Sequence, residues 1–215
     1  MAGSSGFVGA ACHGGSHERQ EAPLGVMATA EAWPAAGQLF TVDDLDRMPD
    51  DGRRYELVDG VLIVSPAPQL RHQEVLGELL VQLRQACPRD LAAVPGPGVR
   101  MSDDTELIPD LVVIRRDQLA ARRVIQPPLL AVEIQSPSTA LFDLNTKKAV
   151  YERFSIESYW IVAPDVDQPE LIAFELREGR YQQVAHVTGG KAFPAQRPFP
   201  VEIVPARLVA GLLPG

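Results

Sequence analysis

Two continuous apolar runs, Leu111–Ile114 and Leu129–Ile134, constrain most strongly what this chain can fold into. Runs rich in β-branched residues and without polar alternation are typical of central strands that are buried on both faces of a sheet. Residues 143–154 have the pattern of a helix, and residues 159–162 that of a further strand. A strand, a helix and a strand in this order predict a crossover with a parallel strand pair. We therefore expect a mixed α/β (α+β) fold, in which helices flank a mixed sheet.

The segments before these strands predict a hairpin and a helix. Residues 55–58 and 61–64 are short apolar runs separated by Asp59 and Gly60, and an Asp-Gly pair at this spacing favours a type I′ hairpin. Across residues 72–86 the apolar positions recur at three- and four-residue steps, as on one face of a helix. This helix is expected to pack on the sheet.

The remaining segments predict smaller elements. Thr41 precedes two aspartates and has the features of an N-cap of a short helix. Residues 171–176, 181–187 and 201–204 alternate weakly between apolar and polar positions and are separated by glycine and proline. They predict an antiparallel C-terminal meander.

The length of 215 residues suits one domain. We expect a disordered leader over residues 1–38, which is rich in small residues, and a folded domain over residues 39–210. Cys12 and Cys87 are too few for a disulfide framework, and no apolar stretch approaches the roughly 18 residues that a membrane span requires. These features predict a cytoplasmic protein with no membrane partner.

The formal net charge of −8 argues against a protein that coats nucleic acid through a broad basic face. It does not exclude a nuclease, whose chemistry depends on a few local groups.

Two carboxylates stand where apolar strands are expected. Asp110 follows Pro109 at the start of one strand, and Glu133 lies inside another. Buried carboxylates must become neutral or find a cation, and a second carboxylate nearby makes this need greater. A divalent metal satisfies both, and Mg²⁺ is well suited because it takes oxygen ligands and needs only one or two carboxylates. We therefore predict that Asp110 and Glu133 are metal ligands for Mg²⁺, with Mn²⁺ as the second candidate; a turn-capping aspartate is the alternative role for Asp110.

Lys147, on the helix after Glu133, is the candidate third member of the site. Its cation can orient or help deprotonate an attacking water, or stabilise negative charge in the transition state. Asp143 and Tyr151 lie four residues to either side on the same helical face, and Asp143 is a candidate ion-pair partner. The adjacent Lys148 leaves open which of the two lysines points inward.

Two further residues have two interpretations each. Glu56 lies in a short apolar strand, and it is either an additional metal ligand or water-orienting acid, or an outward residue paired with Arg54. His72 either packs and forms hydrogen bonds at the start of its helix or contacts nucleic acid.

Together these motifs resemble the Uma2 family of the PD-(D/E)XK, restriction-endonuclease-like superfamily. The motifs occur in this order along most of the chain from about Thr41: residues 55–60, residues 65–68 with Arg71 and His72, Pro109-Asp110, residues 132–139, Asp143 with Lys147 and Tyr151, and residues 159–162. The resemblance implies a restriction-endonuclease-like fold and a magnesium-dependent attack on the phosphodiester bonds of DNA.

Gln135 departs from the parent pattern, which places a lysine two residues after the second acid. Glutamine cannot supply a cation, so it is at most a supporting residue. The resemblance to Uma2 implies that the lysine has migrated to the following helix, where Lys147 takes its place.

Three functional classes are compatible with these residues. The first is a DNA endonuclease; the second is a non-catalytic nucleic-acid-binding or protein-interaction domain on the same fold; the third is a hydrolase of smaller phosphoesters. A homodimer is a candidate assembly, because cleavage of both strands favours two sites related by symmetry.

Overall fold

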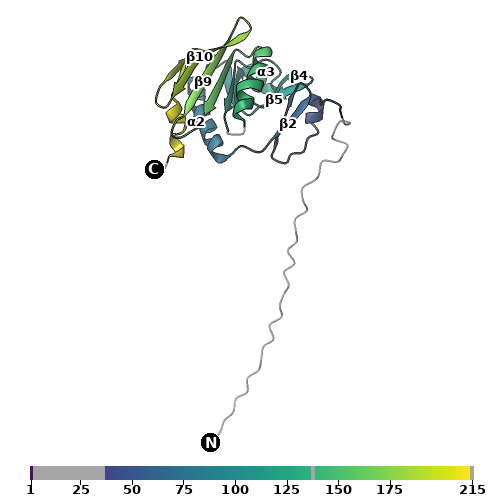
Figure 1. Ribbon diagram of the computed structural model, residues 1–215, viewed down its shortest axis with the longest axis horizontal. Coiled ribbons are helices and arrows are strands. Elements are labelled where there is room, and N and C mark those ends of the chain that lie inside the picture. Colours follow the sequence, from purple (N-terminus) through teal and green to yellow (C-terminus); the bar gives the residue numbers. More distant parts are fainter. Residues whose placement is uncertain (2–36, 137–138, 214–215) are drawn as a thin grey trace.

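A computed structural model describes residue 1, residues 37–136 and residues 139–213 of the chain (Figure 1). The expected leader over residues 1–38 therefore falls almost entirely outside the described residues. The largest sheet has six strands in the order β10-β9-β8-β7-β6-β3. These strands are β3 (Leu91–Pro95), β6 (Leu111–Arg115), β7 (Leu130–Ile134), β8 (Ser158–Ala163), β9 (Glu170–Arg177) and β10 (Arg180–Thr188).

The central strands β6 and β7 are the two continuous apolar runs. Every residue of β7 and every residue of β6 except Arg115 is buried, as expected for strands covered on both faces. β6 pairs antiparallel with β7, whereas β7 pairs parallel with β8. The connection between β7 and β8 contains η3 (Phe142–Lys147) and α3 (Lys148–Arg153), which confirms the predicted crossover. Six of its residues, Phe142–Lys147, form a π-helix, which the sequence pattern did not indicate.

A second sheet has four strands in the order β2-β1-β5-β4. They are β1 (Arg54–Val58), β2 (Val61–Ser65), β4 (Val99–Ser102) and β5 (Thr105–Leu107). The turn between β1 and β2 has positive φ at both Asp59 (49°) and Gly60 (78°), which a type I′ turn requires, so the predicted hairpin is confirmed.

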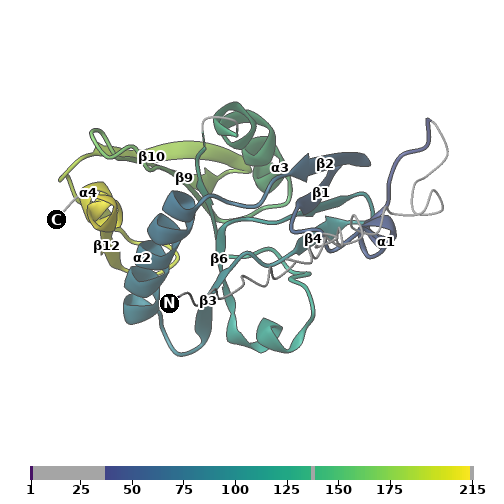
Figure 2. The same ribbon diagram turned by 90° about the horizontal axis from the view of Figure 1, so that it is seen from below.

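Different elements cover the two faces of the six-stranded sheet (Figure 2). On one face, α2 (Leu70–Ala86) buries Val75, Leu79 and Leu83 against the sheet, as its apolar spacing predicted. On the other face, α3 and Leu107 of β5 belong to a second apolar cluster. Both clusters include residues of β7, so this strand lies between two cores.

The C-terminal region differs in part from the prediction. β9 and β10 form the expected antiparallel pair. Residues 201–204 do not extend it: β12 (Val201–Ile203) pairs instead with β11 (Phe193–Ala195) in a separate two-stranded sheet. The reason is packing, because Phe193 and Ile203 are buried in the same cluster as α2. After β12 come α4 (Pro205–Leu208) and η4 (Ala210–Leu212).

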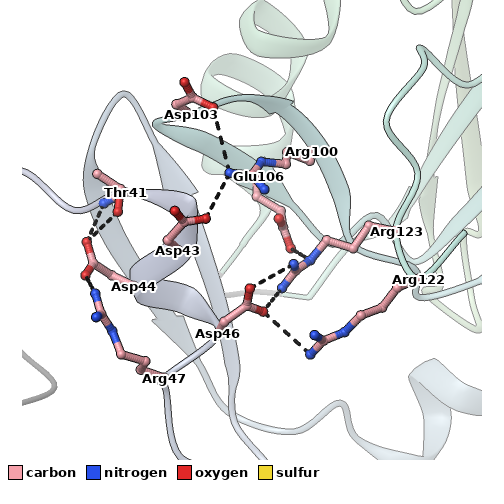
Figure 3. A network of polar contacts seen from close by, with 10 residues as sticks. All are labelled: Thr41, Asp43, Asp44, Asp46, Arg47, Arg100, Asp103, Glu106, Arg122 and Arg123. Carbon is pink, nitrogen blue, oxygen red and sulfur yellow. Dashed lines mark hydrogen bonds and ion pairs between the residues drawn. The ribbon is translucent and has the colours of Figure 1, made fainter.

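The short helix α1 (Val42–Leu45) is attached to the second sheet by charged contacts (Figure 3). The Thr41 N–H and hydroxyl both donate to Asp44, at 2.7 and 2.8 Å, so Thr41 is at the N-cap as predicted. Asp46, which follows the helix, pairs with Arg123, and Arg123 also pairs with the buried Glu106 of β5 at 3.0 Å. η2 (Arg116–Ala120) lies between β6 and this arginine. Within the described part of the chain, no helix is long and apolar enough to cross a membrane.

Candidate active site

The strand register brings the two predicted metal ligands together. Leu111 of β6 stands opposite Val132 of β7, and continuing this antiparallel register by one residue places Asp110 opposite Glu133. Residues opposite each other in an antiparallel pair project on the same face of the sheet, with Cβ atoms roughly 5 Å apart. Both side chains lie in the interior, each residue only 2% exposed. Two like charges in this position destabilise the sheet unless cations compensate them.

Lys147 supplies the cation beside Glu133. Its Nζ donates to Glu133 Oε1 at 3.0 Å and lies 3.2 Å from Glu56 Oε1. The Tyr151 hydroxyl donates to the same Glu133 oxygen at 2.5 Å. These contacts bring four of the sequence-selected residues into one buried cluster at the end of β7.

The helix geometry determines which lysine enters the cluster. Lys147 is the last residue of η3 and is only 5% exposed, whereas Lys148 lies over the rings of Phe174 and Tyr181 at 4.8 and 5.9 Å from their centres. π-helical turns occur often at functional sites, and this one places Lys147 against Glu133. The choice that the sequence left open therefore falls on Lys147.

Asp110 has partners of its own. Its Oδ2 accepts the backbone N–H of Ile134 at 2.8 Å. Its Oδ1 accepts a hydrogen bond from Arg54 Nη1 at 2.7 Å and lies 3.0 Å from His72 Nε2. Burial favours a raised pKa for Asp110, but the contacts with His72, Arg54 and the Ile134 N–H outweigh it, so this pKa lies below its usual value. Asp110 is thus held as a carboxylate, not as a neutral acid.

The structure decides between the two interpretations of Glu56. The outward interpretation, with Arg54 as its partner, is wrong: Glu56 is buried, and Arg54 reaches Asp110. Glu56 Oε1 accepts the backbone N–H of Ile108 at 2.8 Å as well as facing Lys147. Glu56 is therefore part of the cluster.

His72 and Gln135 lie at the edge of the site. His72 comes from the first turn of α2 and contacts Asp110 through Nε2. The Gln135 side-chain amide donates to the carbonyl of Ala140 at 3.4 Å, two residues before η3. Gln135 thus contacts the chain segment that leads into η3 and Lys147.

Carboxylates outnumber cations around Lys147. Burial raises the pKa of Glu133 well above its usual value, and the nearby charges of Asp110, Asp143 and Glu56 act in the same direction, against Lys147. Burial likewise raises the pKa of Asp143 to about 6. Burial alone lowers the pKa of Lys147, but Glu133, Glu56 and Asp143 raise it by more, so Lys147 remains an ammonium group. Three acids therefore surround one ammonium group, and burial disfavours the ionised forms of Glu133 and Asp143.

The chemical nature of the available ligand atoms suits a hard divalent cation. Asp110 and Glu133 offer carboxylate oxygens, the ligand type that Mg²⁺ and Mn²⁺ take, and a bound cation would favour the ionised form of Glu133. Among the described residues, however, no three His, Cys, Asp or Glu side chains are grouped as a ready-made metal cage. Oxygens of both acids instead contact the protein's own cations, Lys147 and Arg54. A site with two protein carboxylates, completed by waters and substrate phosphate, matches the way Mg²⁺ is usually bound.

Arg54 is the site residue that sequence reasoning missed. It lies two residues before Glu56 on β1, and alternate residues of a strand project on the same face. That spacing was the available signal: once Glu56 points into the site, Arg54 points to the same side. The contact between Tyr159 and the Asp143 carbonyl, at 3.0 Å, was also not foreseen.

Comparisons with known proteins identify the family. Residues 42–209 match the Uma2 family, described as "Putative restriction endonuclease", and the chain belongs to this family. Among solved structures, a protein from Anabaena variabilis ATCC 29413, described as "a putative nuclease belonging to DUF820", is similar with a TM-score of 0.64 and 17% sequence identity. The match covers 81% of this chain and 99% of that chain, and it confirms the expected fold. The search of curated proteins found no match.

Proposed function

We propose that this protein is a magnesium-dependent endonuclease that hydrolyses phosphodiester bonds of DNA at Asp110, Glu133 and Lys147. The observation that carries the proposal is the buried Lys147 ammonium, whose Nζ lies 3.0 Å from Glu133 Oε1. Glu133 in turn occupies the strand position opposite Asp110. Such a combination has no evident value for stability, because replacing a buried ion pair by apolar residues is often neutral or stabilising. Membership of the Uma2 family, described as "Putative restriction endonuclease", supports the same interpretation.

Asp110 and Glu133 are the residues that would hold the metal, Mg²⁺ or Mn²⁺. A bound divalent ion supplies Lewis-acid stabilisation of phosphoryl oxygen charge and lowers the pKa of a bound water. Glu56, which lies 3.2 Å from Lys147 Nζ, is an additional buried acid in the cluster.

Lys147 acts as a cation and not as a general base. A base must lose its proton near working pH, whereas the surrounding carboxylates raise the pKa of Lys147 above its usual value. Its ammonium is therefore suited to orient the attacking water or to stabilise charge on the phosphoryl oxygens. The Tyr151 hydroxyl holds Glu133 in place through its hydrogen bond at 2.5 Å. Glu56 holds Lys147 in place through its contact with Nζ at 3.2 Å.

The functional unit that we propose comprises residues 39–210 and acts on DNA in the cytoplasm, with a homodimer as the assembly suited to double-strand cleavage. The net charge of −8 and the glutamine at position 135 favour, as the second candidate, a non-catalytic nucleic-acid-binding or protein-interaction domain.

A cleavage assay distinguishes these candidates. Purified protein is incubated with single- and double-stranded DNA and Mg²⁺ or Mn²⁺, beside the variants Asp110→Asn, Glu133→Gln and Lys147→Met. Lys148→Met is the matched control, because this neighbouring lysine packs on aromatic rings outside the cluster. We expect cleavage by the wild type and the control and its loss in the three variants. DNA binding without cleavage supports the second candidate, and cleavage of small phosphoesters alone makes DNA the wrong substrate.

A further inference from the structure

Two side chains, Arg54 and His72, converge on one oxygen of the proposed metal ligand Asp110. Arg54 Nη1 lies 2.7 Å from Asp110 Oδ1, and His72 Nε2 lies 3.0 Å from the same atom. The two residues come from separate elements, Arg54 from the start of β1 and His72 from the first turn of α2. Neither pairing follows from proximity in the sequence, since Arg54 and Asp110 are 56 positions apart.

The contacts of Arg54 and His72 are concentrated on one oxygen of Asp110, Oδ1. A carboxylate offers about four lone-pair sites. In this case Oδ2 accepts the Ile134 N–H while Oδ1 faces both Arg54 and His72. A divalent cation that binds through Oδ1 must therefore compete with Arg54 and His72.

Both side chains keep capacity for a second partner. Among the described residues, the hydrogen bond of the Arg54 side chain is to Asp110 and uses one of its five N–H donors. His72 Nε2 is buried and forms no aligned hydrogen bond within the described part of the chain, although it lies close to Asp110. A guanidinium group is well matched to phosphate oxygens, which it can bind through two parallel hydrogen bonds.

We propose that Arg54 and His72 form an exchangeable clamp: Arg54 neutralises Asp110 and His72 lies against the same oxygen until substrate arrives, and both side chains then move from this carboxylate to a phosphate of the DNA beside the scissile bond. This inference rests on the proposed function. The exchange keeps charge balanced at each stage, because Asp110 gains a metal contact as Arg54 gains the phosphate. Arg54 is thus a substrate-binding residue that also lowers the affinity of the DNA-free site for metal.

The clamp predicts opposite effects of one substitution on two affinities. Arg54→Gln removes the charge that competes at Asp110, and a hydrogen bond to a charged group contributes about 1.5–3 kcal/mol, or roughly 10- to 100-fold. Mn²⁺ should therefore bind DNA-free Arg54→Gln at least about tenfold more tightly than wild type, measured by titration calorimetry. A short fluorescein-labelled DNA duplex should bind the same variant about tenfold more weakly, measured by anisotropy with Ca²⁺ present. A merely structural role of Arg54 would weaken both affinities or neither.

Controls keep the test independent of folding. Arg53→Gln is the matched control, because its side chain is 63% exposed and pairs at 3.5 Å with Asp51 on the surface. Arg54→Lys retains the charge but not the planar group, and it should keep the wild-type Mn²⁺ affinity while losing part of the DNA affinity. If wild type binds Mn²⁺ and DNA but Arg54→Gln changes neither, or weakens both, the clamp is wrong and the proposed nuclease site stands. If wild type takes up no Mn²⁺, the nuclease site and the clamp are both wrong.

Discussion

Replacing Lys147 by methionine removes the only ammonium group that touches Glu133 and Glu56 among the described residues, while keeping most of the side-chain volume. Both carboxylates then stay in the interior without a cation. Breaking a buried ion pair by removing one partner typically costs about 3–5 kcal/mol, because the remaining charge is left uncompensated. We therefore predict that Lys147→Met lowers the free energy of unfolding by about 3–5 kcal/mol at neutral pH.

Urea denaturation followed by circular dichroism, with EDTA present, measures this loss. The double variant Lys147→Met/Glu133→Gln should recover part of the stability, because it removes one of the two buried carboxylates that the single variant leaves without a cation. Lys148→Met serves as the control and should change stability by less than about 1 kcal/mol, since a partly exposed cation contributes little. A loss below about 1 kcal/mol in Lys147→Met would show that the lysine does not hold the buried carboxylates, and the electrostatic description of the site would be refuted.

Two other predictions concern charges outside this pair. The raised pKa of Asp143, about 6, means that its ionisation favours the unfolded state. The stability that this acid confers is therefore present below pH 3.8 and is lost as pH rises through about 6. Asp143→Asn should gain stability relative to wild type between pH 4 and pH 7, by at most about 3 kcal/mol in matched urea titrations. Arg123→Ala leaves the buried Glu106 without its guanidinium partner and should lower the free energy of unfolding by about 1–3 kcal/mol. Arg122, whose side chain is 80% exposed, provides the control, because Arg122→Ala should have almost no effect. Equal losses of the two variants in thermal unfolding would contradict the network of Figure 3.

Much of the scaffold could be predicted because it depends on local signals. The Asp59-Gly60 pair specified the hairpin through its positive φ angles, and the apolar spacing of α2 specified which face is buried. The apolar runs of β6 and β7 indicated central strands, and their two carboxylates pointed to a site.

The rest depends on tertiary structure. The contact of Arg54 with Asp110 joins residues 56 positions apart, and no periodicity of either segment specifies it. The π-helical turn that places Lys147 inward is a departure from regular helix geometry that hydrophobic spacing does not encode. The pairing of β12 with β11 follows from core packing beneath α2, and the weak alternation of β12 was equally compatible with a place beside β10.

Anomalous diffraction from crystals grown with Mn²⁺ locates the proposed metal. We expect one anomalous peak where Asp110, just before β6, meets the end of β7, contacted by a carboxylate oxygen of Asp110 and one of Glu133, with Lys147 Nζ in the same cluster. A peak elsewhere on the molecule, or no peak in crystals of protein that still cleaves DNA, would contradict the proposed metal site.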